Sequence, residues 1–438
     1  MTKQHEQSFS ASSEHGLTRR GFLGGAAASA AVLTAADMTL LDRLQEPAFA
    51  EELKVRDKRV ILLWLAGGAS QLETFDPKPG RPTGGPYRSI QTAVPGVEVS
   101  ELMPRIAQRL NHTAIIRSLN THIGDHGGGA TLMHLGRRPE AALKLPDLGA
   151  MISKELMRAD SQVPDYVNFY TATEGRSSGV GSSGFLGSRH APMFLTTDTK
   201  PENLSRLTSV SEIDHQQRSD LRDLLSRRFA RGRQSSALAS HNEAYARVRG
   251  LMSSENLFDI SGEPQSVRDR YGPTLFGQQT MVARRLIEAG TPFVKVSRAW
   301  WDSHGQNFET HLELVSELDI VMSALIDDLQ ERGLLDHTLV VTLSEFGRTP
   351  NINQSLGRDH FASAWSISLT GCGIQGGSVY GKTDDDGQTV VEGELGAAEV
   401  FATIFSALGI DHQKEYHIGS RPVPLTDPGS EAVSEVLA

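Results

Sequence analysis

The chain has 438 residues, a formal net charge of −10 at pH 7 and a single cysteine, Cys372. The acidic balance argues against nucleic acid as the main partner. One cysteine excludes both an intrachain disulfide and a thiolate metal cluster.

The first 50 residues are typical of a twin-arginine signal peptide. Arg19 and Arg20 directly precede an apolar segment rich in Ala and Gly (24–33), and Ala48-Phe49-Ala50 is a small-residue cleavage site. This order predicts twin-arginine export to a periplasmic or extracellular location, with an ordinary secretory signal or a helical N-terminus as alternatives. The apolar segment is too short for a stable membrane span, and no later run approaches the necessary length. Residues 51–438 are therefore expected to form one α/β domain.

Buried strands and helices alternate along the remainder of the chain. Short apolar runs rich in β-branched residues predict strands of a mainly parallel sheet at 59–65, 113–117, 293–297, 338–343 and 365–370. The run at 365–370 is interpreted as another parallel strand. Helical patterns predict helices at 101–110, 275–289, 308–332 and 395–408. The expected architecture is a central sheet sandwiched by helices.

The stretch from about 164 to 270 has a different character. It begins with a Gly/Ser-rich loop at 177–188, and polar segments with alternating charges follow, as in a solvated helix face. We interpret this stretch as a helical insertion or cap over one edge of the sheet.

Chemically active side chains gather where the predicted strands end. In an open α/β sheet, ligands bind beyond the carboxyl ends of the strands. Four such ends carry carboxylates and imidazoles, namely Glu73 and Asp76; His122, Asp125 and His126; Asp302 and His304; and Glu345, Asp359 and His360. For Glu73 and Asp76, capping of the next element is an equal alternative. Arg348 and Arg358 add planar guanidinium groups that bind phosphate, sulfate or carboxylate.

This set of residues indicates metal-assisted chemistry on an anionic ester. Oxygen and imidazole ligands without thiolates suit zinc, manganese, iron or calcium. A divalent ion would polarise the ester oxygen, and an arginine would stabilise the charge that develops.

Several motifs carry a family resemblance that covers nearly all of the chain after the signal. They are Gly67-Gly68-Ala69-Ser70, Thr74-Phe75-Asp76-Pro77-Lys78-Pro79, His126-Gly127, Trp301-Asp302-Ser303-His304, Glu345-Phe346-Gly347-Arg348-Thr349-Pro350 and Gly357-Arg358-Asp359-His360. Together they resemble a bacterial, twin-arginine-exported family known as domain of unknown function 1501. That family looks like a divergent sulfatase-like branch of the alkaline phosphatase superfamily. The resemblance implies a mainly parallel sheet between helices, with metal ligands at the strand ends.

The resemblance also implies roles for single residues, and it exposes departures. Asp302, His304 and His360 match the superfamily's ligand pattern, whereas Gly67-Gly68 stands where that pattern has an Asp. His126 occupies the place of the nucleophile, where Ser, Thr or Cys is expected. The expected catalytic residues are His126, Arg348 and Arg358, and the expected ligands of a divalent ion (zinc, manganese or calcium) are Asp302, His304, Glu345, Asp359, His360 and Asp76.

Two classes of function stay open from the sequence. The first is an exported metal-dependent hydrolase of sulfate or phosphate esters, with polysaccharide esters among its candidate substrates. The second is a non-catalytic exported protein, for binding or surface assembly, that keeps the fold and part of the site. The gathering of His, Asp and Arg favours the first class, and the lack of a hydroxyl or thiol at position 126 favours the second.

Overall fold

The computed structural model describes residues 57–438, apart from 159–160, 162, 171–180, 196–197, 202–203, 205–206, 232–244, 246–247, 251 and 253. The predicted signal peptide, 1–50, lies outside these described residues, so the twin-arginine assignment stays a prediction. Among the described helices, none combines the length and apolar character that a membrane crossing requires.

Eight strands form one mixed sheet in the order β12-β4-β11-β8-β1-β7-β5-β6. Their bounds are β1 Arg59–Leu65, β4 Thr113–Leu119, β5 Tyr166–Phe169, β6 Met193–Leu195, β7 Phe293–Arg298, β8 Thr338–Leu343, β11 Trp365–Gly371 and β12 Val379–Tyr380. The central strand, β1, pairs in parallel with β7 on one side and with β8 on the other. Every residue of β1 and β8 is buried, which explains why both read as continuous apolar runs. The predicted α/β architecture with a mainly parallel sheet is confirmed.

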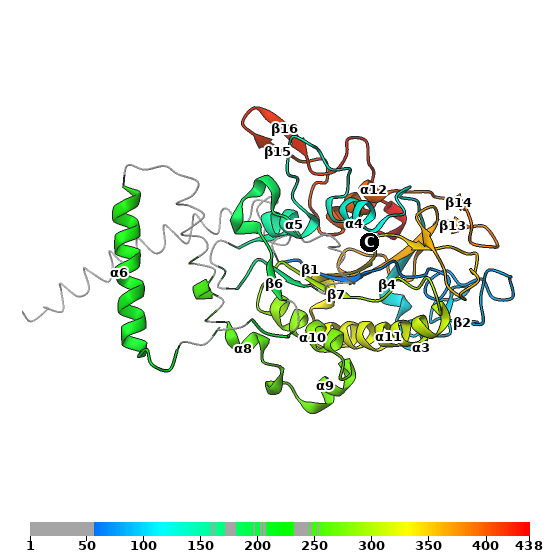
Figure 1. Cartoon of the computed structure of the whole chain (residues 1–438), viewed down its shortest axis with the longest axis horizontal. Helices are drawn as coiled ribbons and strands as arrows, with labels where there is room; N and C mark the ends of the chain where they lie inside the picture. Colours follow the sequence, from blue (N-terminus) through cyan, green and yellow to red (C-terminus); the bar gives the residue numbers. More distant parts are fainter. Residues whose placement is uncertain are drawn as a thin grey trace, which may run out of the picture. The chain divides into compact units, whose positions relative to one another are not determined.

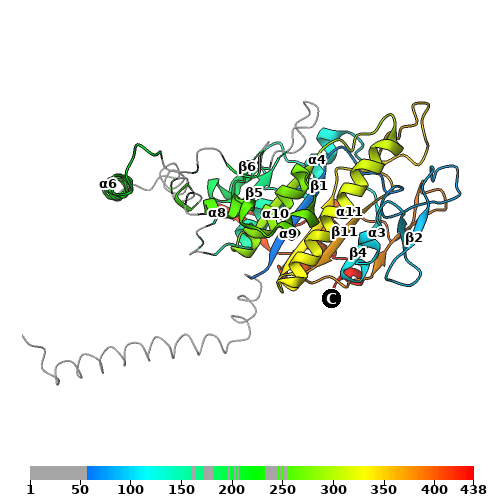
Figure 2. The ribbon, with the colours of Figure 1, turned by 90° about the horizontal axis from the view of Figure 1, so that it is seen from below.

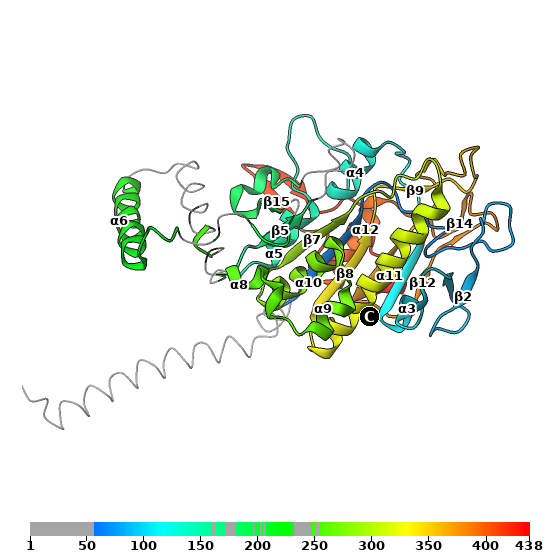
Figure 3. The ribbon, with the colours of Figure 1, turned by 60° about the horizontal axis from the view of Figure 1, so that its bottom comes forward.

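Helices cover both faces of this sheet (Figure 1). One face carries α4 (His126–Leu135), α5 (Leu148–Leu156) and α12 (Ala397–Ala407). The other carries α3 (Pro104–Ala107), α9 (Gln265–Tyr271), α10 (Leu275–Glu288) and α11 (Asn307–Glu331), and both Figure 2 and Figure 3 show α10 and α11 lying over the strands. Side chains of β1 alternate between the two apolar layers: Ile61, Leu63 and Leu65 pack toward α10 and α11, and Val60, Leu62 and Trp64 toward the opposite layer.

The loops contain short two-stranded ribbons and 3₁₀ turns. Four two-stranded ribbons pair β2 (Ser89–Gln91) with β3 (Glu98–Ser100), β9 (Gly347–Arg348) with β10 (His360–Phe361), β13 (Lys382–Thr383) with β14 (Val390–Glu392), and β15 (Glu415–Ile418) with β16 (Arg421–Pro424). Single 3₁₀ turns are η1 (Leu110–His112), η2 (Gly184–Leu186), η3 (Ser188–His190), η4 (Ile260–Gly262), η5 (Leu335–His337) and η6 (Ser434–Val436).

The direction predicted for the run at 365–370 is wrong. Strand β11 is antiparallel to both β8 and β4. A parallel partner would need a long crossover, usually helical, whereas the chain between β8 and β11 forms only the β9–β10 ribbon and loops. The reversal matters for the site, because β11 begins at the edge of the sheet where β8 ends.

The stretch from 164 to 270 is more than a helical insertion. It contains the helices α6 (Glu212–Ala230) and α8 (Glu255–Phe258), but it also supplies β5 and β6 to the main sheet. No residue of α6 is buried, in agreement with the alternating charges that predicted a solvated helix face. Much of the second predicted helical stretch, 237–257, lies outside the described residues.

Candidate functional site

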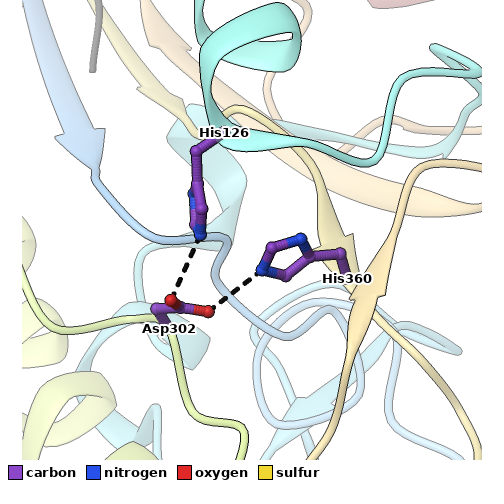
Figure 4. A group of neighbouring side chains, drawn as sticks. All are labelled: His126, Asp302 and His360. Atoms are coloured by element: carbon purple, nitrogen blue, oxygen red, sulfur yellow. Dashed lines mark hydrogen bonds and ion pairs between the residues drawn. The ribbon is translucent and has the colours of Figure 1, made fainter. Parts of the chain in front are cut away.

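The residues expected at a shared site come together at one edge of the sheet. Because β11 is antiparallel to β4 and β8, the carboxyl ends of those two strands and of β1 and β7 meet the start of β11 there. His126 is the first residue of α4, Asp302 follows β7, and His360 precedes β11. Their side chains point toward one another from these separate elements (Figure 4).

A single carboxylate, that of Asp302, lies at the centre of this cluster. Its Oδ2 atom is 3.1 Å from Nε2 of His126, and its Oδ1 atom is 3.2 Å from Nε2 of His360 (Figure 4). Nε2 of His304 lies 3.0 Å from the same Oδ1 atom and 3.0 Å from Nε2 of His360. The Nε2 atoms of three imidazoles thus converge on one carboxylate.

The other ring nitrogens explain why the Nε2 atoms face the centre. Each Nδ1 lies against a group that can only accept a hydrogen bond: His126 against Oε1 of Glu345 at 2.9 Å, His304 against Oδ1 of Asp359 at 2.8 Å, and His360 against the carbonyl of Gly124 at 2.7 Å. Each Nδ1 atom must therefore carry a proton, so any of these rings that is neutral has its lone pair on Nε2. Outer partners of this kind are what orient histidines that bind a metal ion.

The cluster strongly perturbs two of its own groups. Burial alone would lower the pKa of His126, but hydrogen bonds with Asp302 and Glu345 outweigh burial and raise it to about 9. Burial would raise the pKa of Asp302, yet hydrogen bonds with His126 and His360, together with the Arg348 charge, hold it well below its usual range. The carboxylate of Asp302 is therefore an anion at any physiological pH.

These donors fit a divalent metal ion. One ligand atom from each of His126, Asp302 and His360 lies within 4.8 Å of the others, and Nε2 of His304 adjoins them. Three imidazole nitrogens and one carboxylate suit zinc or manganese, whereas calcium prefers an all-oxygen set.

The two predicted anion-binding arginines are used within the protein. The guanidinium of Arg348 is fully buried and donates to Oδ1 of Asp302 at 2.6 Å, to the carbonyls of Gly68 (2.8 Å) and Arg358 (3.1 Å), and to the carbonyl of Gly67. Arg358, also fully buried, pairs with Glu73 at 2.8 Å and donates to three backbone carbonyls. Their geometry supports a positioning role for both arginines in place of contact with a substrate.

The remaining predicted ligands lie around or away from the centre. Glu345 and Asp359 orient His126 and His304 from outside. Asp76 lies elsewhere, since its carboxylate pairs with Lys78 at 3.1 Å and accepts from the Thr383 hydroxyl at 2.5 Å. Other nearby groups play structural parts: Asp125 caps α4 through the amide of Gly128, and Glu73 holds Arg358.

Two glycines belong to the site, one of them unforeseen. Gly67 has φ +120°, and a Cβ atom there would lie 2.5 Å from the backbone nitrogen of Asp302. The close approach of the β7 loop leaves no room for a carboxylate side chain after β1. The paired glycines were the sign of this close approach in the sequence. Gly124 acts through its carbonyl, which any residue type would offer, so the sequence held no signal for it.

The fold and the cluster together define an α/β protein with a histidine- and aspartate-lined metal-type site at the carboxyl edge of its sheet. The chain belongs to the family described as "Protein of unknown function (DUF1501)", whose match spans residues 57–437. No curated protein matches it in sequence.

Solved structures with a similar chain path are distant in sequence. The PsFucS1 sulfatase from Pseudoalteromonas sp. is 13% identical with a TM-score of 0.39, over 85% of this chain and 71% of that one. The phosphonate monoester hydrolase of Agrobacterium radiobacter is 11% identical (TM-score 0.36; 86% and 76% covered), and a mutant of TAB5 alkaline phosphatase with bound magnesium is 11% identical (TM-score 0.37; 81% and 98% covered).

Proposed function

We propose that this protein is a metal-dependent hydrolase of sulfate or phosphate esters. One observation carries the proposal: three imidazoles, each held through Nδ1 by an acceptor, direct their Nε2 atoms at the carboxylate of Asp302. Without an ion, a proton on Nε2 of His126 bonds this ring to Asp302, which is why the pKa of His126 is raised. A divalent cation would take the place of that proton and accept the lone pairs of the imidazoles and of the carboxylate at once.

The residues divide into ligands and supports. Asp302, His304 and His360 would hold the ion, together with His126, and zinc suits this set best. When bound, the ion supplies a Lewis acid that polarises an ester oxygen. Arg348 fixes Asp302 by its charge and by one hydrogen bond of 2.6 Å, and Glu345 fixes His126. The surrounding backbone at Gly67 and Gly68 is tied to the same guanidinium, so the edge of the sheet is pre-organised.

The test combines ion content with hydrolysis of simple esters. We expect purified protein to contain a stoichiometric divalent ion and to hydrolyse nitrophenyl sulfate or nitrophenyl phosphate. His360→Ala should lose most of the ion and the activity together, because it removes one converging nitrogen. His417→Ala, an exposed histidine on β15, is the matched control and should keep both. Wild-type protein without ion and without esterase activity would refute the proposal and favour a non-catalytic binding protein.

We further propose export by the twin-arginine route to the periplasm or the cell exterior. The support is the Arg19-Arg20 pair ahead of an apolar segment and the Ala48-Phe49-Ala50 site. N-terminal sequencing of exported protein should begin at Glu51. Replacing both arginines by lysine should retain the precursor in the cytoplasm, and continued export of this variant would argue for the general secretory route.

A further inference from the structure

Helix α6 carries apolar side chains that remain largely exposed. Leu221, Leu224 and Leu225 are 56%, 57% and 55% exposed, and Ile213 is 70% exposed. Every residue of this 19-residue helix is described, and none is buried. Most helices in proteins owe their stability to the packing of an apolar face, and clusters of exposed apolar side chains mark interaction surfaces. The leucines therefore point to a partner from outside the chain.

The leucines share one face of α6 with two opposite charges. Seven residues make nearly two helical turns, so Asp214, Leu221 and Arg228 lie almost along one line on the helix surface. Leu224 and Leu225 flank this line about one turn after Leu221. The face therefore carries an acid at one end, leucines in its middle part and a base at the other end.

The described contacts between α6 and later residues use other sides of the helix. The guanidinium of Arg222 lies 4.1 Å from the centre of the Tyr245 ring, and Asp223 pairs with Arg249 at 2.7 Å. Positions 222 and 223 lie about 100° and about 160° around the helix from Leu221. These contacts leave the leucine face open.

The two charges on this face are available to a partner. Arg228 is exposed, and no ion pair joins it to another described residue. Asp214 is also exposed, and its carboxylate accepts a hydrogen bond of 2.7 Å from the hydroxyl of Ser211. A carboxylate has room for further hydrogen bonds beyond this one.

The distribution of charge along α6 identifies the partner as a second copy of the helix. Three of its four acidic side chains lie in 212–220 and three of its four arginines in 221–230, so its net charge is zero. Attraction to an anionic membrane would instead need an excess of basic residues. When two copies run antiparallel, the acidic half of each faces the basic half of the other. The same charges favour the helix through its dipole, but the dipole does not account for the exposed leucines.

We propose that α6 is a self-association surface, through which two copies of this chain pair with their α6 helices antiparallel and centred on Leu221. About this centre, Asp214 of one copy lies opposite Arg228 of the other, and the two-fold symmetry makes this pair twice. The leucines pack between the two ion pairs. The self-association surface is independent of the proposed hydrolase function.

Sedimentation equilibrium of the purified protein tests this surface. Wild-type protein should shift from monomer to dimer between about 1 μM and about 1 mM. Leu221→Gln combined with Leu224→Gln should raise the dissociation constant at least tenfold, because the middle of the helix pair loses its apolar contacts. Gln216→Ala, which lies about 140° around the helix from Leu221, is the control and should leave the constant unchanged. Wild-type protein that stays monomeric, or leucine variants that dimerise as wild type does, would overturn the proposal.

An exchange of charges tests the antiparallel arrangement. Asp214→Arg and Arg228→Asp each place like charges opposite one another, so each should weaken association at least tenfold, or about 1.4 kcal/mol. The double variant restores opposite charges and should associate almost as tightly as wild type. Both substitutions oppose the helix dipole, so simple loss of helix would make the double variant weaker than either single variant. That order of affinities would refute the antiparallel pairing.

Flotation with vesicles of phosphatidylcholine and phosphatidylglycerol separates self-association from membrane binding. The wild type and the double leucine variant should float to the same small extent, because α6 has no excess of basic charge. Flotation of the wild type that the leucine variant loses would show that this face enters a membrane, and it would overturn the proposal.

Discussion

At the scale of single residues, the site depends on which nitrogen of each histidine carries the proton. His126, His304 and His360 all use Nδ1 toward an acceptor. The residue types and their positions after strands were visible in the sequence, which is why Asp302, His304 and His360 could be predicted as a group. The tautomers could not be predicted, because the groups that set them come from distant parts of the chain and one of these groups is a backbone carbonyl.

The partners of Arg348 are also distant in sequence, and they lead to a prediction. Sequence reasoning expected it to contact the substrate, but its partners at Gly67 and Gly68 lie about 280 positions earlier. Arg348→Lys keeps the charge and loses the fork, so at least two buried carbonyls lose their donors. We expect the free energy of unfolding to fall by about 2 kcal/mol, with a loss of ion content.

Urea unfolding and metal analysis of the Arg348→Lys variant measure these effects. Arg88→Lys, at an exposed position, is the control and should change neither quantity. A variant with unchanged stability and ion content but a raised KM for the ester would instead show that Arg348 contacts the substrate.

At the scale of elements, strand positions could be predicted well and strand direction could not. The runs at 59–65 and 338–343 match β1 and β8 residue for residue. A strand that is buried on both faces is apolar whether it is parallel or antiparallel to its neighbours. The sequence of β11 therefore did not indicate its antiparallel direction. The short, helix-free link from β8 was the only available signal. The strands β5 and β6 were missed for a related reason, since both are short and lie within a polar stretch.

The turn after β1 yields a prediction at this scale. Gly67→Ala would place a Cβ atom 2.5 Å from the nitrogen of Asp302 and 2.9 Å from the carbonyl carbon of Trp301, at φ +120°. The β7 loop must then move, and Asp302 moves with it. We expect ion affinity to fall at least tenfold, because groups that hold a metal ligand in place affect affinity by this much, and competition with a chromophoric chelator measures it.

A second glycine separates this effect from simple backbone strain. Gly80 also has a positive φ, +76°, but nothing lies within 4 Å of a Cβ atom there. Gly80→Ala should cost about 1 kcal/mol of stability and leave ion affinity unchanged. Equal ion affinities for the two variants would show that the close approach at Gly67 does not position Asp302.

At the scale of the whole molecule, one buried charge links stability to pH. Lys295 on β7 is 1% exposed, lies 2.5 Å from Nε2 of His134, and has its ammonium 4.7 Å from the centre of the Trp64 ring. Burial, only partly opposed by the charges of Asp147 and Glu345, lowers the pKa of Lys295 to about 7. Between pH 7 and 10.5 the unfolded chain therefore binds the proton more tightly, and stability rises with pH through this window.

Lys295→Met removes this dependence. The stability gained by the variant over wild type should be larger at pH 7 than at pH 9.5, by roughly 3 kcal/mol. Urea unfolding at both pH values measures the difference. Lys382→Met, at an exposed position on β13, is the control. A gain that is the same at both pH values would mean that Lys295 stays charged in the folded protein.

The site joins segments of the chain that are synthesised at very different times. His360 contacts a carbonyl 236 positions before it, and Arg348 reaches back 281 positions to Gly67. During synthesis, a nascent chain that has not yet emerged from the ribosome as far as β11 contains Asp302 but lacks the contacts that Arg348 and His360 make with its carboxylate. Capture of the proposed ion would therefore be a late step in biogenesis, coupled to closure of the sheet and slow for the same reason that any fold of high contact order forms slowly. A ribosome-stalled chain ending before Arg348 should take up no ion, however complete its first strands are.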